Sequence, residues 1–266
     1  MLLRPYLILY RNRLVAAALF SLLAALVEAV LGANLCNCPP DLAEVPNRFF
    51  YLVYLSNVIL CIFLGLILGF GPAGPLPGGS SLVRFLLTRP IARTSIQLYP
   101  LLIAIASIVL LPGLGWLVLL ACLRLLHSPW LAHLLAIAER APSASELGPN
   151  PGLVPLLGAL HLGPRYVAAV SVGLGMYAPL AAQRWLMLNG QKAVRIFGGI
   201  TVPILVLPMA IPLLLSIPSC ATGIFLLPPP HAGLTYLPSN LGVALHLAFA
   251  AAWSFGTFAA LREIEV

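Results

Sequence analysis

Long apolar runs, almost free of charge, alternate with short polar segments along the whole chain. The runs are continuous and do not alternate polar with apolar residues, which favours helices over half-buried strands. A helix needs about 20 predominantly apolar residues to cross the hydrocarbon core of a membrane. Six runs meet or approach that length, over residues 14–33, 50–70, 98–120, 166–182, 197–217 and 241–261. The pattern predicts an all-α fold with six membrane-spanning helices in one domain over residues 1–266.

Proline residues complicate two of these regions. The third run continues to Leu126, with Pro112 and Gly113 in its middle. We expect a single kinked or tilted helix there, because a hairpin would need two halves that are each too short to cross the membrane. A further apolar stretch over 153–163 is short and is followed by Pro164, so we expect it to lie in the membrane interface or to be re-entrant.

The composition excludes a soluble protein. Of the 266 residues, 61% are hydrophobic and 8% are charged, and the mean hydropathy is +1.03. A soluble domain carries about 25% charged residues to cover its surface, and disordered chains are also rich in charge. The formal net charge of +7 does not indicate nucleic-acid binding, because the basic residues occur in short clusters between apolar runs. We expect the chain to lie in a lipid bilayer.

The distribution of lysine and arginine predicts the orientation, since cytoplasmic loops carry an excess of these residues. With the N-terminus in the cytoplasm, ten of the fourteen fall inside and four outside. Those inside are Arg4, Arg11, Arg13, Arg84, Arg89, Arg93, Arg184, Lys192, Arg195 and Arg262. Those outside are Arg48, Arg124, Arg140 and Arg165. We expect cytoplasmic termini in the inner (cytoplasmic) cell membrane, with the first run retained rather than cleaved as a signal peptide.

The sequence lacks the common motifs of enzymatic chemistry. It contains no GxxxxGK(S/T) phosphate loop, no HExxH zinc motif and no GxSxG nucleophile elbow. The five cysteines form no paired CxxC motifs, and we interpret His127 and His133 as surface residues. We therefore expect no catalytic residue, no cofactor and no bound metal in this chain.

Glu28 is the one clear ionisable residue inside a predicted span. It lies about 7 Å inside the outer end of the first span, at 1.5 Å per residue counted from Ala33. Ionisable residues within a membrane are costly and usually functional, so Glu28 could be a polar contact in a transport pathway or in a dimer seam. Alternatively, it is near enough to the interface to reach headgroups or water. The sequence leaves both interpretations open.

The segment between the second and third spans is the most informative part of the sequence. Residues 71–81 are rich in glycine and proline, which form turns. Residues 82–94 interleave apolar residues with three arginines, which predicts an interfacial elbow with its apolar side toward lipid. Pro90 suits the first position of a helix, so Ile91 onward should begin the third helix. By physics alone, this elbow could equally be a simple membrane anchor.

The run Phe85-Leu86-Leu87-Thr88-Arg89-Pro90-Ile91-Ala92-Arg93-Thr94 resembles the signature after the second span in type-2 ATP-binding-cassette (ABC) exporter permeases. Members of that family show a leucine-rich turn, a serine or threonine, and then proline, an aliphatic residue, a small residue and arginine. The chain length, the six spans and the cytoplasmic termini also fit the family. So does the ending Ala260-Leu261-Arg262-Glu263-Ile264.

The resemblance implies a transmembrane subunit that works with a separate ABC ATPase and with a second permease copy, identical or different. In that family the segment before the third span contacts the ATPase and transmits its closure. Carried over to this chain, the ATPase-coupling residues are Leu86, Leu87, Thr88, Arg89, Pro90 and Arg93. Family members often carry an acidic residue in this loop, whereas residues 71–97 contain none. The resemblance does not identify the transported substrate.

Other functions are also compatible with the sequence. In the main alternative, the chain is a non-transporting membrane scaffold or assembly protein, and residues 82–94 only dock a cytoplasmic partner. An intramembrane enzyme is a third possibility, but it would need clustered ionisable groups within the spans.

The predicted outer loops carry weaker signals. Cys36 and Cys38 are too close in sequence for an unstrained mutual disulfide, so a bridge to Cys220 or to another chain competes with free thiols. In the largest outer loop, residues 124–152, leucines at helical spacing predict a short amphipathic helix. Three prolines predict a bend in the fifth span, namely Pro203, Pro208 and Pro212.

Overall fold

The computed structural model describes residues 3–35, 44–69, 93–125, 163–183, 195–199 and 238–262. Four long helices are α1 (Leu3–Leu35), α2 (Glu44–Gly69), α4 (Arg93–Leu125) and α9 (Asn240–Arg262). A further long helix covers Gly163–Gln183, and a short one covers 195–199. These described ranges contain no β-strand, so the all-α prediction is confirmed for this part of the chain.

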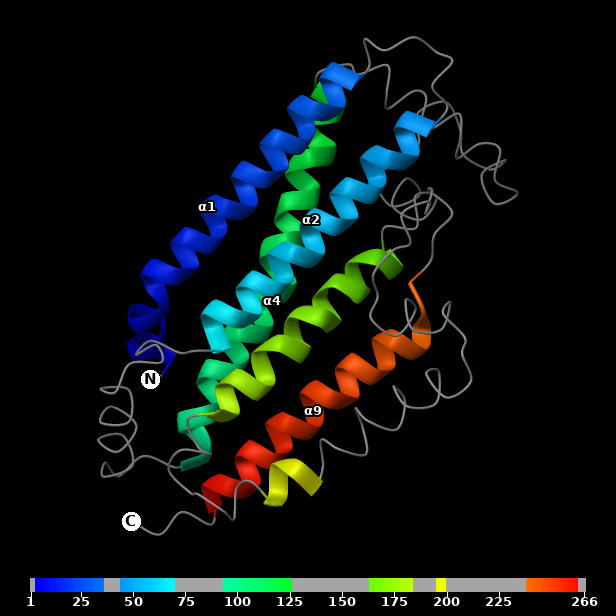
Figure 1. Ribbon diagram of the computed structural model, residues 1–266. Helices are drawn as coiled ribbons and strands as arrows, with labels where there is room; N and C mark the ends of the chain where they lie inside the picture. The colour runs from blue at the N-terminus through cyan, green and yellow to red at the C-terminus, as the bar shows by residue number, and fades with distance from the viewer. Residues whose placement is uncertain are drawn as a thin grey trace, which may run out of the picture.

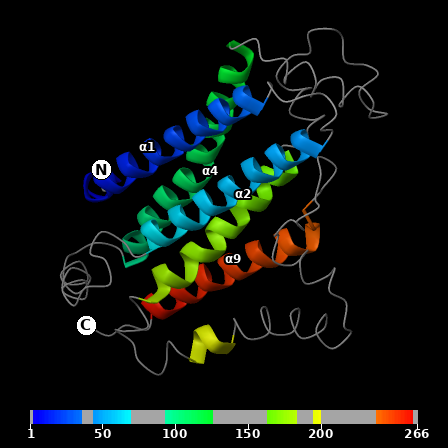
Figure 2. The same ribbon diagram turned by 45° about the horizontal axis from the view of Figure 1, so that its top comes forward.

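The five long helices lie side by side in one bundle (Figure 1). From one flank to the other the order is α1, α2, the Gly163–Gln183 helix and α9, with α4 behind α1 and α2 (Figures 1 and 2). α4 packs against α1, α2 and α9 and also contacts the Gly163–Gln183 helix. α1 and α4 run in one direction and the other three helices in the opposite direction, so the start of α1 and the end of α9 lie at the same end of the bundle.

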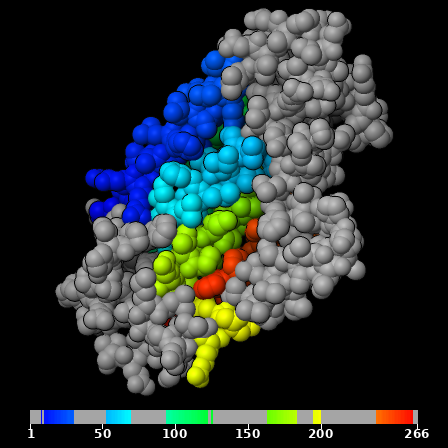
Figure 3. Space-filling model, in the orientation of Figure 1, coloured from blue at the N-terminus to red at the C-terminus, as the bar shows by residue number. Residues whose placement is uncertain are grey.

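The outer surface of the bundle is strongly apolar. Large hydrophobic side chains are exposed on all five long helices, among them Leu19 and Leu23 of α1, Leu110 of α4 and Phe255 of α9. α1 and α2 form one long flank of the molecule in the space-filling view (Figure 3). Soluble proteins rarely expose contiguous apolar surface of this extent, whereas lipid accommodates it.

Four helices of the described chain are long and apolar enough to cross a membrane, namely Tyr10–Val30, Thr94–Cys122, Gly163–Gln183 and Asn240–Arg262. α2 contains a shorter apolar helical stretch, Val53–Gly69. Together with the exposed apolar surface, these helices make the chain a multi-pass membrane protein, as the composition predicted.

The predicted spans match the described helices closely. The first, third, fourth and sixth predicted spans fall entirely within α1, α4, the Gly163–Gln183 helix and α9, and the second matches α2 up to Gly69. The Gly163–Gln183 helix starts three residues before the predicted fourth span. It includes Pro164 in its first turn, where the missing N–H is no loss. The fifth span (197–217) is described only up to residue 199, within the short helix 195–199, and the elbow before Arg93 and most of the 124–152 loop lie outside the described residues.

α4 is one continuous helix that passes through both Pro100 and Pro112, as predicted for the long third run. A proline inside a helix removes one N–H donor and pushes the preceding turn open. The turn around Pro112 has two donors from neighbouring helices. Ser21 Oγ of α1 donates to the carbonyl of Leu111 at 2.9 Å, and the Tyr166 hydroxyl donates to the carbonyl of Val109. Pro112 removes the backbone donor to the carbonyl of residue 108, so these side chains bond to neighbouring carbonyls of the disturbed turn rather than replacing the missing bond.

Glycine residues bring the helix backbones close together. A Cβ atom at Gly69 of α2 would lie 2.7 Å from Leu180 Cβ, and one at Gly173 would lie 2.8 Å from the Cys61 carbonyl oxygen. Gly65 meets the same helix at the carbonyl oxygen of Gly173. Gly65 and Gly69 form a GxxxG pair, a spacing that lets membrane helices approach closely. In this chain the pair packs α2 against the Gly163–Gln183 helix.

A buried apolar cluster joins four helices at the centre of the bundle. Tyr10 of α1, Leu64 of α2, Ile108 of α4 and Tyr177 of the Gly163–Gln183 helix belong to it, and each is at most 2% exposed. The cluster holds α4 between α1 and the Gly163–Gln183 helix, so a movement of α4 has to be shared with its neighbours.

Candidate functional site

The intramembrane carboxylate of Glu28 lies in the seam between α1 and α2. The hydroxyl of Ser56 on α2 donates a hydrogen bond to Glu28 Oε1, and both side chains are partly buried. The next residue, Asn57, is 5% exposed, and its Nδ2 donates to the carbonyl of Val53 at 2.8 Å. A small polar group therefore sits inside an otherwise apolar helix pair.

The geometry bears on both interpretations of Glu28. Its partner among the described residues is a neutral hydroxyl on a different helix of the same chain. A hydrogen bond between two membrane helices contributes to their association. The carboxylate is thus tied to the α1–α2 seam, where it holds the two helices together and leaves a charged or proton-carrying group within the membrane.

The predicted ATPase-coupling residues are only partly within the described chain. Leu86, Leu87, Thr88, Arg89 and Pro90 lie outside it, and Arg93 is the first residue of α4. The first turn of α4 is firmly held in the bundle, because Ile96 is 4% and Gln97 is 1% exposed. A displacement applied at Arg93 therefore acts on a helix that is buried within one turn of its start.

The sequence predicts Arg13 only as one of the positive charges on the cytoplasmic side. In the structure its Nη1 donates to the carbonyl of Ile67 at 2.7 Å. Ile67 belongs to the last turn of α2, whose carbonyls have no partner within the helix. A cation also interacts favourably with the negative end of the helix dipole. Arg13 thus ties α1 to the end of α2 that leads into the predicted elbow.

No sequence pattern directly predicts this contact, the Ser21 and Tyr166 contacts to α4, or the pairing of Ser56 with Glu28. Pro112 was the only available signal, because a proline within a span implies that nearby carbonyls need outside donors. Which helix supplies those donors follows only from the arrangement of the bundle.

The described residues contain no group of three or more histidine, cysteine, aspartate or glutamate side chains placed to hold a metal ion. Cys61 is a buried thiol and Cys122 a partly exposed one, and neither is bridged. The remaining candidates of the sequence, Cys36, Cys38, Cys220, His127 and His133, lie outside the described ranges.

Comparison of the chain with known protein families, with curated proteins and with solved structures gives no match. The class that the fold itself defines is an all-helical, multi-pass membrane protein.

Proposed function

We propose that this chain is the transmembrane permease subunit of an ATP-driven ABC exporter, energised by a separate ATPase subunit. The observation that carries the proposal is the run 85–94, which resembles the coupling signature of type-2 exporter permeases and leads directly into α4. ATP hydrolysis then takes place in the partner, and this chain contributes movement rather than catalysis.

The geometry of α4 supports a mechanical role for this helix. It is 33 residues long and continues without interruption from Arg93 to Leu125. It packs against α1 and shares the buried cluster around Ile108 with α2 and the Gly163–Gln183 helix. A push at the elbow would be passed along α4 to these helices, which is how a chain without its own nucleotide site can use the closure of an ATPase.

The directions of the helices support six crossings. The Gly163–Gln183 helix ends at the end of the bundle where α1 begins, whereas α9 begins at the opposite end (Figure 1). The predicted span 197–217 lies between these two helices in the sequence and would supply the return crossing. In this arrangement both termini lie on the cytoplasmic side of the inner membrane. Transport proceeds by alternating access between two permease copies, identical or different.

The first test is affinity purification of the tagged chain from membranes, followed by identification of its partners. We expect an ATPase with a Walker motif to co-purify. The double variant R89E/R93E should abolish substrate-stimulated ATP hydrolysis by the reconstituted complex, because the basic elbow no longer fits the ATPase. R184E, which changes another predicted cytoplasmic arginine outside the elbow, is the matched control and should retain activity.

The result also separates transport from scaffolding. A scaffold that docks a cytoplasmic partner would lose that partner in R89E/R93E, but ATP turnover in its complex would not respond to any transported compound. Absence of a nucleotide-hydrolysing partner in the purification would contradict the permease assignment.

A further inference from the structure

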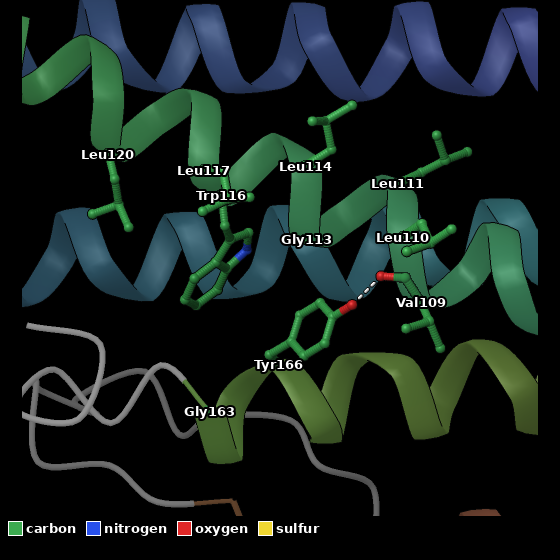
Figure 4. Close-up of a pocket in the computed structure, with 10 residues that line it drawn as sticks. All are labelled: Val109, Leu110, Leu111, Gly113, Leu114, Trp116, Leu117, Leu120, Gly163 and Tyr166. Atoms are coloured by element: carbon green, nitrogen blue, oxygen red, sulfur yellow. Dashed lines mark hydrogen bonds between the residues drawn. The ribbon is translucent and has the colours of Figure 1, made fainter. Parts of the chain in front are cut away.

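A pocket opens at the surface of the bundle between α4 and the start of the Gly163–Gln183 helix (Figure 4). Its volume is about 540 Å³, which is within the range of small-molecule binding sites. Leu110, Leu114 and Leu117 line it from α4, and all three are exposed on the outer surface. Because that surface faces lipid in a membrane protein, the pocket is accessible sideways from the bilayer.

One side chain of the pocket has an unused hydrogen-bond donor. Trp116 is 7% exposed, and within the described chain its Nε1–H has no acceptor at hydrogen-bonding distance. The rings of Trp116 and Tyr166 lie on facing sides of the pocket, and the indole nitrogen is on the edge nearer Tyr166 (Figure 4). The Tyr166 hydroxyl already donates to the carbonyl of Val109. Buried donors are nearly always paired, so an acceptor oxygen is expected beside this indole.

The depth of Trp116 in the membrane identifies the type of oxygen. The apolar part of α4, Thr94–Cys122, has 29 residues, which span about 43 Å at 1.5 Å per residue. The hydrocarbon core is about 30 Å thick, so a centred helix extends about 7 Å into the headgroup layer at each end. The boundary then falls near Leu117, next to Trp116. Ester carbonyls of phospholipids lie at this boundary, where tryptophan is also enriched.

The rest of the pocket matches the chain attached to such a carbonyl. From Trp116 to Val109 it extends about 10 Å toward the membrane centre along α4, and its lining there is apolar. A polar solute would lose its hydrogen bonds to water in this space without replacement, whereas an acyl chain would not. The bilayer also supplies acyl chains directly at the mouth of the pocket.

We propose that this pocket binds one acyl chain of a diacyl phospholipid from the leaflet at the Leu125 end of α4, with the ester carbonyl accepting a hydrogen bond from Trp116 Nε1. Nε1 is itself buried, so this hydrogen bond requires the indole to rotate until its N–H faces that oxygen. The site is independent of the proposed transport function, because it requires only that α4 spans the bilayer.

The test uses the full chain reconstituted in vesicles of phosphatidylcholine that contain a trace of phosphatidylcholine with a diazirine in one acyl chain. After illumination, the labelled residues are identified by mass spectrometry. We expect labels concentrated on residues 109–120 and Tyr166, well above those on the exposed leucines Leu19 and Leu23 of α1.

Two variants separate binding from general lipid contact. Gly163 lines the pocket and its Cβ position has nothing within 4 Å, so Gly163→Phe should fill the space without a clash and remove the concentrated labelling. Gly198→Phe is the matched control, because Gly198 also has nothing within 4 Å but does not line the pocket. Trp116→Phe keeps the apolar volume and removes the donor, so labelling should fall about two- to tenfold, as expected for one hydrogen bond.

Three results would overturn the proposal. Labelling in proportion to surface exposure would show that lipid contacts the pocket no more than the rest of the outer surface. Unchanged labelling in Gly163→Phe would place the lipid elsewhere. Formation of a disulfide dimer by Leu114→Cys in a background without other cysteines, together with unlabelled pocket residues, would show that a second copy covers this face.

Discussion

Gly173 shows how little space separates the helices of this bundle. A Cβ atom added there would lie 2.8 Å from the Cys61 carbonyl oxygen of α2 and 2.9 Å from Ile108 Cγ2 of α4. The first of these atoms belongs to a backbone and cannot turn aside. The size of the side chain at position 173 therefore limits how closely the Gly163–Gln183 helix can approach α2 and α4.

The first prediction concerns Gly173→Ala. We expect the free energy of unfolding to fall by about 1–3 kcal/mol, the usual cost of overpacking. Thermal unfolding in detergent measures the change. Gly198→Ala, at a position with nothing within 4 Å of the added methyl group, is the control and should leave the midpoint nearly unchanged. Equal midpoints for the two variants would show that the seam is looser than described.

The second prediction concerns the hydrogen bond between Ser56 and Glu28. A double-mutant cycle with Ser56→Ala and Glu28→Leu should give a coupling energy of about 0.6 kcal/mol, the average for hydrogen bonds between membrane helices, and at most about 1.7 kcal/mol. Ser56→Ala combined with Thr257→Val in α9 should be additive, because the Thr257 hydroxyl donates within its own helix to the Trp253 carbonyl. A coupling energy near zero for the first pair would mean that the carboxylate is not held by α2.

At the scale of the element, α4 is one continuous helix, but Pro112 weakens the turn that precedes it. Pro112 disturbs the hydrogen bonds of the preceding turn, and Ser21 and Tyr166 supply donors to that turn from two other helices. The helix therefore depends on its neighbours at this turn. The same turn borders the pocket at Val109 and Gly113.

The third prediction tests this dependence. Tyr166→Phe should lower the free energy of unfolding by about 1 kcal/mol, the typical contribution of one hydrogen bond. In a Pro112→Ala background the cost should be smaller, because alanine returns the backbone N–H and lets the turn close. Thermal unfolding of the four proteins in detergent checks this. An equal cost in both backgrounds would show that the tyrosine bond is unrelated to the proline.

At the scale of the whole molecule, the start of α1 and the end of α9 lie at the same end of the bundle (Figure 1). The end of α4, at Leu125, lies at the opposite end. This arrangement fits the proposed topology, in which the chain crosses the membrane an even number of times and the lysine and arginine distribution predicts cytoplasmic ends.

The fourth prediction follows from this arrangement. In a variant without the five native cysteines, Arg11→Cys and Arg262→Cys should react with a membrane-impermeant maleimide only after the cytoplasmic side is opened. Leu125→Cys, whose native residue is 79% exposed, should react in intact cells. Labelling of positions 11 and 262 from opposite sides would contradict an even number of crossings.

The sequence by itself determined that this protein is a helical membrane protein and where the apolar part of each described long helix lies, although α1 and α2 begin 11 and six residues before the predicted spans. The physical reason is that bilayer thickness fixes the length of an apolar run, and the run itself can be read without knowing its neighbours. The long run through Pro112 was predicted as one helix for the same reason, and it is one helix.

The tertiary structure decided which faces of these helices meet. Leucine and alanine are equally compatible with lipid and with a neighbouring helix, so hydropathy contains no information about partners. Ser56 beside Glu28, Arg13 on the end of α2, and the pocket at Trp116 all depend on how the helices are rotated and ordered. Those choices follow from close packing at glycine and small polar residues, which bring together segments far apart in the chain.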